Sequence, residues 1–173
     1  MNQDGLGCII VDRNIRVAIG HEFWEAFMKI YETEHFVLES AKKPEIDRLD
    51  GGHIKISPKD PVEDRTKLTS LQSTELEWLT SLAGEAFAAG MAHRGAKIGR
   101  INYQDNGNWN PALHVHLYGR AIDAKMQKYG DPIKPGYLPE YSPLDDGDVE
   151  AISEEIRRLE RTEKYNRDNW RIV

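Results

Sequence analysis

The chain has 173 residues, of which 39% are hydrophobic and 30% are charged, and its formal net charge is −6. This composition is typical of a single globular domain and excludes a disordered chain and an integral membrane protein. The acidic excess argues against electrostatic binding of nucleic acid, although backbone N–H groups and a few side chains can still hold the phosphates of one nucleotide.

The expected location follows from the first residues and from cysteine usage. The opening letters, MNQDGLGC, lack the basic and apolar regions of a secretory signal. No apolar run approaches the roughly 18 residues that a membrane-spanning helix needs. Cys8 is the single cysteine, so an internal disulfide cannot form. We therefore expect a cytoplasmic protein that does not bind membranes.

The first half of the chain predicts short elements. Residues 6–19 contain two apolar stretches separated by a turn, and Glu22–Met28 favours a short helix. Three segments have the composition or alternation of strands, and these are 29–33, 36–40 and 53–57. The polar segment 41–50 indicates a connecting loop, and Pro58 is expected to end the strand that begins at His53.

A long helix is predicted from Thr69 or Ser73 to about Ala92. Thr69 and Gln72 have the spacing of a capping box, and apolar residues then recur at helical intervals. Gly95 can end the helix in a left-handed conformation that other residues resist.

The second half predicts two more strands and another helix. The strands, 98–104 and 112–120, flank a turn-rich segment at 105–111. A proline-rich stretch at 130–147 indicates an extended segment, and Val149–Leu159 has the pattern of an amphipathic helix. The charged tail from Arg161 carries Tyr165 and Trp170, which favours docking of the tail on the rest of the domain.

The most informative residues lie in the last predicted strand. Successive side chains of a strand alternate, so His114, His116 and Tyr118 point to one face, with neighbours about 6.5–7 Å apart. Val115 and Leu117 point to the other face, where they can join a core. Two imidazoles on one face are costly unless each ring nitrogen has a partner, and imidazole exchanges its proton near neutral pH. The pair therefore predicts a chemical site.

The segment LHVHLYGR resembles the signature of the histidine triad superfamily, in which histidines alternate with apolar residues. The segments KIYETEHFVLES, GGHIKISPKDPVEDRTKLTSLQSTELEWLTSL and RINYQDNGNWN resemble other family blocks in the family's order. The resemblance covers about residues 29–120. It implies one α+β domain with an antiparallel sheet, one long helix packed against it, an N-terminal addition at 1–28 and a C-terminal extension at 121–173.

The resemblance also implies an activity. Such enzymes bind a nucleotide conjugate, such as a dinucleoside polyphosphate or a nucleoside phosphoramidate, and hydrolyse or transfer at its α-phosphate. By this resemblance His116 attacks phosphorus to form a nucleotidyl-histidine, and His114 orients it and contacts the phosphate. The covalent route divides one difficult displacement into two easier ones. No cofactor or metal is implied, and a homodimer formed through the long helix and an adjacent strand is expected.

Several further residues are candidates for the phosphate site. The resemblance and the loop composition assign nucleotide or phosphate binding to Asn102, Asn106, Gly107, Asn108 and His53. Lys55 and Arg120 can also meet phosphates, although a solvated charge is the expected state of each. The other histidines, His21, His35 and His93, are expected on the surface.

The third triad position departs from the family pattern, because Tyr118 stands where the family has histidine. Its hydroxyl can donate a hydrogen bond to a phosphate or a leaving group, but a phenol with a pKa near 10 is a weak acid. The resemblance therefore leaves the leaving group and the speed of turnover open.

Two other functions remain in competition. A His-x-His strand also presents metal ligands, as in cupins, with Asp123 or His53 completing the set. The long preceding helix and the segment GRAIDAKMQ after the pair argue against a cupin. Alternatively, the fold binds a nucleotide without catalysis, which the tyrosine favours.

Overall fold

The computed structural model describes residues 28–41, 43–105, 110–134 and 136–172, which form a five-stranded antiparallel sheet with α-helices packed against it. The strands, in the spatial order β1-β2-β3-β5-β4, are β1 (Met28–Glu32), β2 (Phe36–Ser40), β3 (His53–Pro58), β4 (Ile98–Asp105) and β5 (Val115–Ala121). The helices are α1 (Ser70–His93), α2 (Asp146–Leu159) and α3 (Arg167–Trp170). The predicted α+β class, with its antiparallel sheet and long helix, is confirmed.

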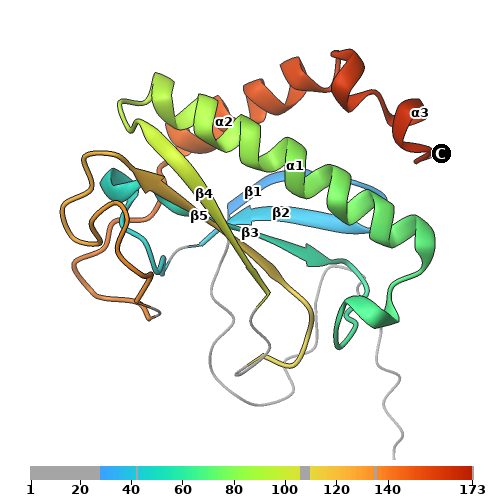
Figure 1. Cartoon of the computed structure of the whole chain (residues 1–173), viewed down its shortest axis with the longest axis horizontal. Coiled ribbons are helices and arrows are strands. Elements are labelled where there is room, and N and C mark those ends of the chain that lie inside the picture. The colour runs from blue at the N-terminus through green and yellow to red at the C-terminus, as the bar shows by residue number, and fades with distance from the viewer. Residues whose placement is uncertain (1–27, 42, 106–109, 135, 173) are drawn as a thin grey trace, which may run out of the picture.

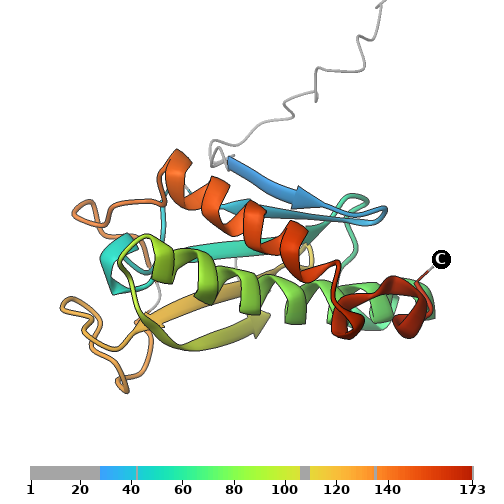
Figure 2. The same ribbon diagram turned by 90° about the horizontal axis from the view of Figure 1, so that it is seen from above.

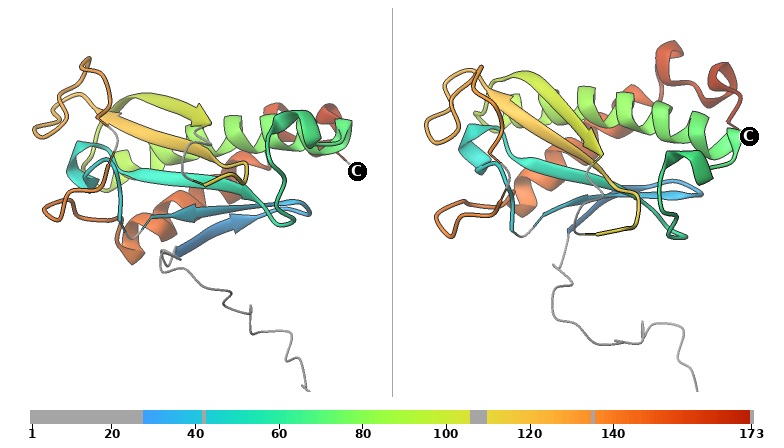
Figure 3. Two further views of the ribbon diagram at one scale, coloured as in Figure 1. Left: turned by 90° about the horizontal axis from the view of Figure 1, so that it is seen from below. Right: turned by 60° about the horizontal axis from the view of Figure 1, so that its bottom comes forward.

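Both long helices lie on one face of the sheet (Figures 1 and 2). Seen from below, the opposite face carries no helix within the described part of the chain (Figure 3). Alternation along the strands explains the two faces. Ile54, Val115 and Leu117 point toward the helices and are fully buried, where they share one core with Leu82 and Phe87 of α1. The residues between them face the open side, which we call the open face.

The ends of α1 follow the sequence prediction. The Gln72 N–H donates to Thr69 Oγ1 at 3.2 Å, and the Thr69 N–H donates to Gln72 Oε1 at 2.9 Å, which completes the capping box. The helix ends at His93, and Gly95 follows with φ +87°, in the left-handed region. These contacts satisfy backbone groups that the first and last turns leave without helical partners.

Three predicted boundaries are wrong. β5 begins at Val115 instead of residue 112, because the Leu113 N–H donates to the Val62 carbonyl at 2.7 Å and so leaves the strand ladder. β3 includes Pro58, one residue beyond its expected end. Met28 pairs with Ser40 in the sheet and does not end a helix. The rest of the 22–28 helix prediction and the two apolar stretches at 6–19 lie outside the described residues.

The loop that precedes β3 lies against β5. It contains a short 3-10 helix, η1 (Arg48–Asp50), within the predicted connecting loop. Gly51 has φ +127°, and a Cβ there would lie 2.4 Å from the carbonyl carbon of Gly119. A side chain at position 51 would therefore push the loop away from the strand that carries the histidines.

The C-terminal residues pack into the same core as the sheet. The predicted helix at 149–159 is confirmed as α2, and its Ile152 and Ile156 are fully buried. Trp78 of α1 donates its indole N–H to the Tyr165 carbonyl at 3.1 Å, so the tail docks as expected. None of the helices in the described residues is long and apolar enough to span a membrane.

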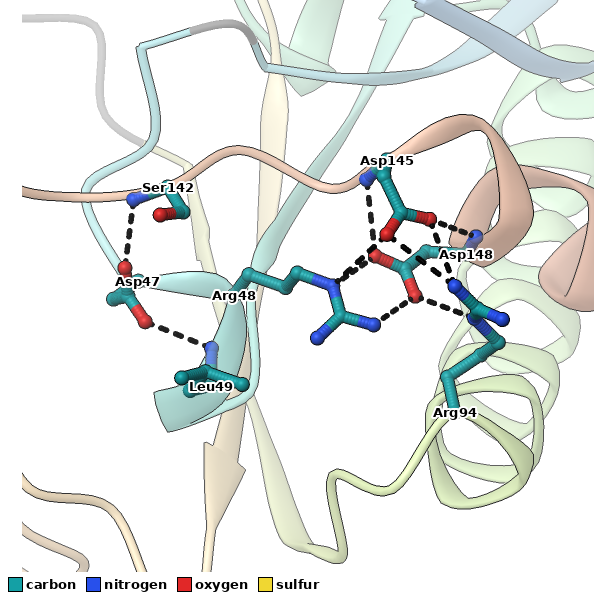
Figure 4. A network of polar contacts seen from close by, with 7 residues as sticks. All are labelled: Asp47, Arg48, Leu49, Arg94, Ser142, Asp145 and Asp148. Carbon is teal, nitrogen blue, oxygen red and sulfur yellow. Dashed lines mark hydrogen bonds and ion pairs between the residues drawn. The ribbon is translucent and has the colours of Figure 1, made fainter.

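An ionic network joins the loop before β3 to both long helices (Figure 4). Asp148 of α2 is fully buried and accepts hydrogen bonds from Arg48 Nε and Nη2 at 2.5 and 2.6 Å. It also accepts one from Arg94 Nε at 3.1 Å, just beyond the end of α1. One carboxylate thus holds three segments that are distant in sequence.

Candidate functional site

The register of the sheet places the predicted site residues next to one another on the open face. Directly opposite residues of antiparallel strands share a face. His116 of β5 lies opposite Lys55 of β3 and Gln104 of β4. By the same register, Tyr118 is flanked by His53 and Asn102, both of which were predicted to contact phosphate. The remaining predicted phosphate contacts, Asn106, Gly107 and Asn108, lie outside the described residues.

The aromatic rings of this face form a continuous row. The His114 and His116 ring centroids are 4.7 Å apart, and those of His116 and Tyr118 are 5.3 Å apart with nearly parallel planes. The His53 ring lies 5.0 Å from that of His116. The prediction that His114, His116 and Tyr118 share a face is confirmed, even though His114 precedes the strand.

Each histidine has a defined hydrogen-bond partner. His53 Nε2 lies 2.8 Å from His116 Nδ1. On its other side, His53 Nδ1 accepts the backbone N–H of Glu45 at 3.3 Å. His114 Nδ1 lies 2.7 Å from the Ala112 carbonyl, to which it can only donate.

The surroundings of His116 and His53 keep both rings neutral. Burial, together with the nearby His114 and Lys55, lowers the pKa of His116 to about 3. Burial, reinforced by the nearby His116, also holds the pKa of His53 well below its usual value. At pH 7 each ring therefore carries one proton and can use the lone pair of its other nitrogen.

Tyr118 is fully buried, and its hydroxyl is directed at a carboxylate. The hydroxyl donates to Glu45 Oε2 at 2.6 Å. Burial and the hydrogen bond to Glu45 raise the pKa of the phenol above its usual value, so it stays protonated. The Tyr118 proton thus faces the loop before β3 and lies on the side of the ring row away from His114.

A cleft of about 680 Å³ borders this row on the open face. His114 and Lys55 line its end nearest His116, and Val37, Lys29 and Lys59 line other parts of its wall. A second, smaller cavity of about 340 Å³ meets His114 from the other side, beside Arg65 and Thr66. His114 therefore lies between two cavities. Lysines and glutamates line the larger one, and Arg65 lines the smaller one together with Glu63, Asp64 and Asp105.

Two charged or polar residues differ from their expected state. Arg120 is buried, not solvated, because its Nη2 donates to the carbonyls of Lys128 and Asp131 at 2.8 and 3.0 Å. His35 is half-buried, and its Nδ1 lies 2.5 Å from a carboxylate oxygen of the buried Glu75. Neither faces the cleft. His93 is exposed, as predicted.

The sequence analysis missed Glu45, Gln104 and Gln127. Gln104 was detectable, because it lies two residues after Asn102 in a predicted strand and so shares its face. Glu45 follows Pro44 in a polar loop, and no spacing links it to Tyr118, 73 residues away in sequence. Gln127 donates to the Glu45 carbonyl at 2.7 Å from a segment without periodicity.

The metal alternative finds little support in the geometry. Among the described residues, no group of three His, Cys, Asp or Glu side chains converges closely enough to hold a metal ion. Both ring nitrogens of His53 have the partners given above, and Asp123 is exposed in the turn beyond β5. The single sheet with one covered face also differs from a cupin.

The sheet order, the long helix and the histidine row on the open face define the histidine triad fold. Comparison with solved structures shows the same fold. The chain is similar to a hypothetical histidine triad nucleotide-binding protein from Sulfolobus tokodaii, with 20% identity, a TM-score of 0.56, and coverage of 82% of this chain and 91% of that one.

Two further solved structures agree. A histidine triad protein from Bradyrhizobium japonicum has 18% identity and a TM-score of 0.53 over 76% of this chain and 89% of its own. One from Marinobacter aquaeolei has 19% identity and a TM-score of 0.51 over 77% and 88%. No protein-family model and no curated protein sequence matches the chain. The fold that the motif predicted is confirmed.

Proposed function

We propose that this protein is a nucleotide-binding enzyme of the histidine triad superfamily that hydrolyses or transfers at the α-phosphate of a nucleotide conjugate. The observation that carries the proposal is the neutral His116, which lies beside His114 and Lys55 where these two residues border the 680 Å³ cleft. A cleft of this size can hold a nucleoside. The neighbouring Lys55 supplies positive charge and hydrogen-bond donors for a phosphate.

The proposed reaction assigns a role to each group. His116 attacks the α-phosphorus, a nitrogen–phosphorus bond forms, and the bond from phosphorus to the leaving group breaks. Water or another acceptor then attacks the same phosphorus and releases the histidine. Lys55 contacts the phosphate oxygens, and His114 orients His116. Asn102 and the loop residues Asn106, Gly107 and Asn108 stay predictions for further phosphate contacts.

The test is a panel of dinucleoside polyphosphates and nucleoside phosphoramidates, with chromatography of the released nucleoside monophosphate. The proposal expects release from at least one conjugate, at a rate that scales with protein concentration. Calorimetric titration with the same compounds measures binding separately. Tight binding without product would indicate a nucleotide-binding module instead of an enzyme. The absence of both binding and product would refute the function in both forms.

One observation favours the binding module as the second candidate. The Tyr118 hydroxyl, which stands at the third triad position, donates to Glu45 and is fully buried. A leaving group in the cleft therefore gains no direct proton donor from this position. The titration described above measures this alternative directly.

Substitution of Tyr118 by phenylalanine tests whether the hydroxyl acts in turnover. Because the hydroxyl donates to Glu45, we expect Tyr118→Phe to slow turnover by less than the roughly 100-fold that loss of an acid–base group typically costs. The free energy of unfolding should fall by about 1 kcal/mol, because Glu45 loses a hydrogen-bond donor. Initial rates and urea unfolding measure the two effects, with the exposed Tyr129→Phe as the matched control. An unchanged rate would leave Tyr118 with a packing role.

The expected homodimer is a separate proposal. β4 forms one edge of the sheet in the described part of the chain, and Tyr103 on this strand is 48% exposed. Its ring lies over Gly84 of α1, so strand and helix present one surface. We expect a dimeric mass by light scattering at micromolar concentration, and a monomeric mass for Tyr103→Arg but not for Tyr129→Arg. A monomeric wild-type protein would contradict the proposal.

A further inference from the structure

We propose that Glu45 is a positioning residue whose backbone N–H, acting through His53, holds the resting site with the His116 ring proton on Nε2. In this tautomer the Nε2 of His116 carries a proton, which it can donate to an anion in the cleft. The same nitrogen then has no lone pair with which to attack phosphorus. The assignment follows from three consecutive contacts, from Gln127 to Glu45, from Glu45 to His53 and from His53 to His116.

The contact between Glu45 and His53 determines the first tautomer. A backbone N–H is a donor only, so the His53 Nδ1 that receives it at 3.3 Å must present a lone pair. A neutral imidazole carries one proton, which therefore sits on His53 Nε2. His53 is 4% exposed, so water has little access to compete for either nitrogen.

The second tautomer follows from the first. The protonated His53 Nε2 lies 2.8 Å from His116 Nδ1, and a hydrogen bond at this distance needs one donor and one acceptor. Since His53 is the donor, His116 Nδ1 is the acceptor and carries no proton. The neutral His116 ring therefore holds its proton on Nε2.

His114 takes the opposite tautomer, although its ring is only 4.7 Å from that of His116. Its Nδ1 lies 2.7 Å from the Ala112 carbonyl, which can only accept. The proton of a neutral His114 is thus on Nδ1, and its Nε2 has the lone pair. The adjacent histidines His114 and His116 consequently differ in which ring nitrogen carries the proton.

The tautomer has a consequence for turnover that rests on the proposed function. Attack on phosphorus through His116 Nε2 needs the lone pair of that nitrogen, which requires the proton on Nδ1. His116 Nδ1 could then donate to His53 Nε2 only if the His53 proton moved to Nδ1, where it would meet the Glu45 N–H. The hydrogen bond between Glu45 and His53 must therefore open before covalent attack.

The Glu45 backbone is held by the C-terminal segment. Gln127 Nε2 donates to the Glu45 carbonyl at 2.7 Å, and Gln127 Oε1 accepts the Lys134 N–H at 2.9 Å. The Gln127 N–H in turn donates to the buried Asp50, at 2.6 Å. Gln127 is 5% exposed, so these bonds form inside the protein. The segment beyond β5 thereby holds Glu45 through the peptide group that follows the N–H in contact with His53.

Nitrogen NMR of the full chain labelled with ¹⁵N-histidine tests the assignment at pH 7. Long-range proton–nitrogen correlations distinguish a ring nitrogen that carries a proton from one that does not. We expect protonated Nε2 and unprotonated Nδ1 in both His53 and His116, and a protonated Nδ1 in His114. The variants His53→Gln and His116→Gln assign the signals. A protonated His116 Nδ1 in the wild-type protein would overturn the proposal.

Two variants separate the backbone contact from the side chain. Glu45→Ala keeps the amide and should leave both tautomers unchanged. Gln127→Glu removes the donor to the Glu45 carbonyl, so we expect the His53 and His116 signals to move toward a mixture of tautomers. Gln72→Glu at the start of α1 is the matched control and should have no effect. Unchanged tautomers in Gln127→Glu would overturn the role of the Glu45 anchor.

These measurements are independent of the proposed activity. The tautomers are recorded without any nucleotide, so a protein that shows them and releases no product would refute the enzyme and keep the inference. A protein that turns over its substrate with the His116 proton on Nδ1 would support the enzyme and refute the inference. Should Gln127→Glu fail to fold, the wild-type spectrum alone still decides the tautomer.

Discussion

The His116→Ala protein should release nucleoside monophosphate at least about 1,000-fold more slowly than the wild-type protein on any conjugate that the panel identifies. Loss of a covalent nucleophile removes the pathway itself, and in other covalent enzymes it costs several orders of magnitude. Nucleotide binding should survive, because Lys55, His114 and the rest of the cleft are unchanged. Initial rates and calorimetric titration measure the two properties in parallel.

The wild-type protein allows a direct search for the covalent intermediate, which should be absent from His116→Ala. A nucleotidyl-histidine is a phosphoramidate and is labile in acid, so it should be trapped under alkaline denaturing conditions and located on the peptide HVHLYGR. His114→Ala should slow turnover less completely, and the exposed His93→Ala should not slow it. Near-normal turnover in His116→Ala would disprove covalent catalysis at this residue and bring the binding module forward.

The Asp148→Ala protein should lose about 3 kcal/mol of unfolding free energy, which is a large effect for a single substitution. Removing one partner of a buried ion pair leaves the remaining charge without compensation. Here Arg48, whose side chain is 17% exposed, loses two hydrogen bonds, and Arg94 loses one (Figure 4). Urea unfolding measures the loss. Asp146→Ala, an exposed residue in the same helical turn, should change stability by less than about 1 kcal/mol.

The network also predicts a pH dependence with a definite sign. Burial alone would raise the pKa of Asp148, but hydrogen bonds from Arg48, the Asp145 backbone and Arg94 outweigh burial and lower it below 3.8. The stabilisation is therefore fully present above about pH 4 and is lost as the pH falls through the lower pKa of the folded state. The stability difference between wild type and Asp148→Ala should shrink below pH 4. A constant difference down to pH 2 would contradict the assigned ion pair.

Local sequence patterns were sufficient to predict the strands of the sheet and its long helix. Thr69 and Gln72 form the cap that their spacing predicts, and alternation in HIKIS and HVHLY separates core-facing from site-facing residues. The same alternation brought the predicted His53 and Asn102 to opposite sides of Tyr118. Such patterns succeed because they depend on neighbours a few residues away, which the sequence displays directly.

The remaining features depend on contacts between segments that share no local pattern. Arg120 looked like a surface charge because nothing near it indicates that backbone carbonyls at 128 and 131 turn back to receive it. Likewise, the link between Glu45 and Gln127 joins two irregular segments 82 residues apart. Polar residues in loops reveal their partners only after the chain has folded, so periodicity cannot identify them.

The bond between Tyr118 and Glu45 has a consequence for the history of this protein lineage. A histidine at position 118 would place a different donor at a different distance from the half-buried Glu45 carboxylate, which now accepts a hydrogen bond from the phenol at 2.6 Å. Exchange of tyrosine and histidine at this position therefore calls for a compensating change at position 45. Positions 45 and 118 should co-vary among homologous sequences, and a tyrosine at 118 should be inherited together with an acidic residue at 45.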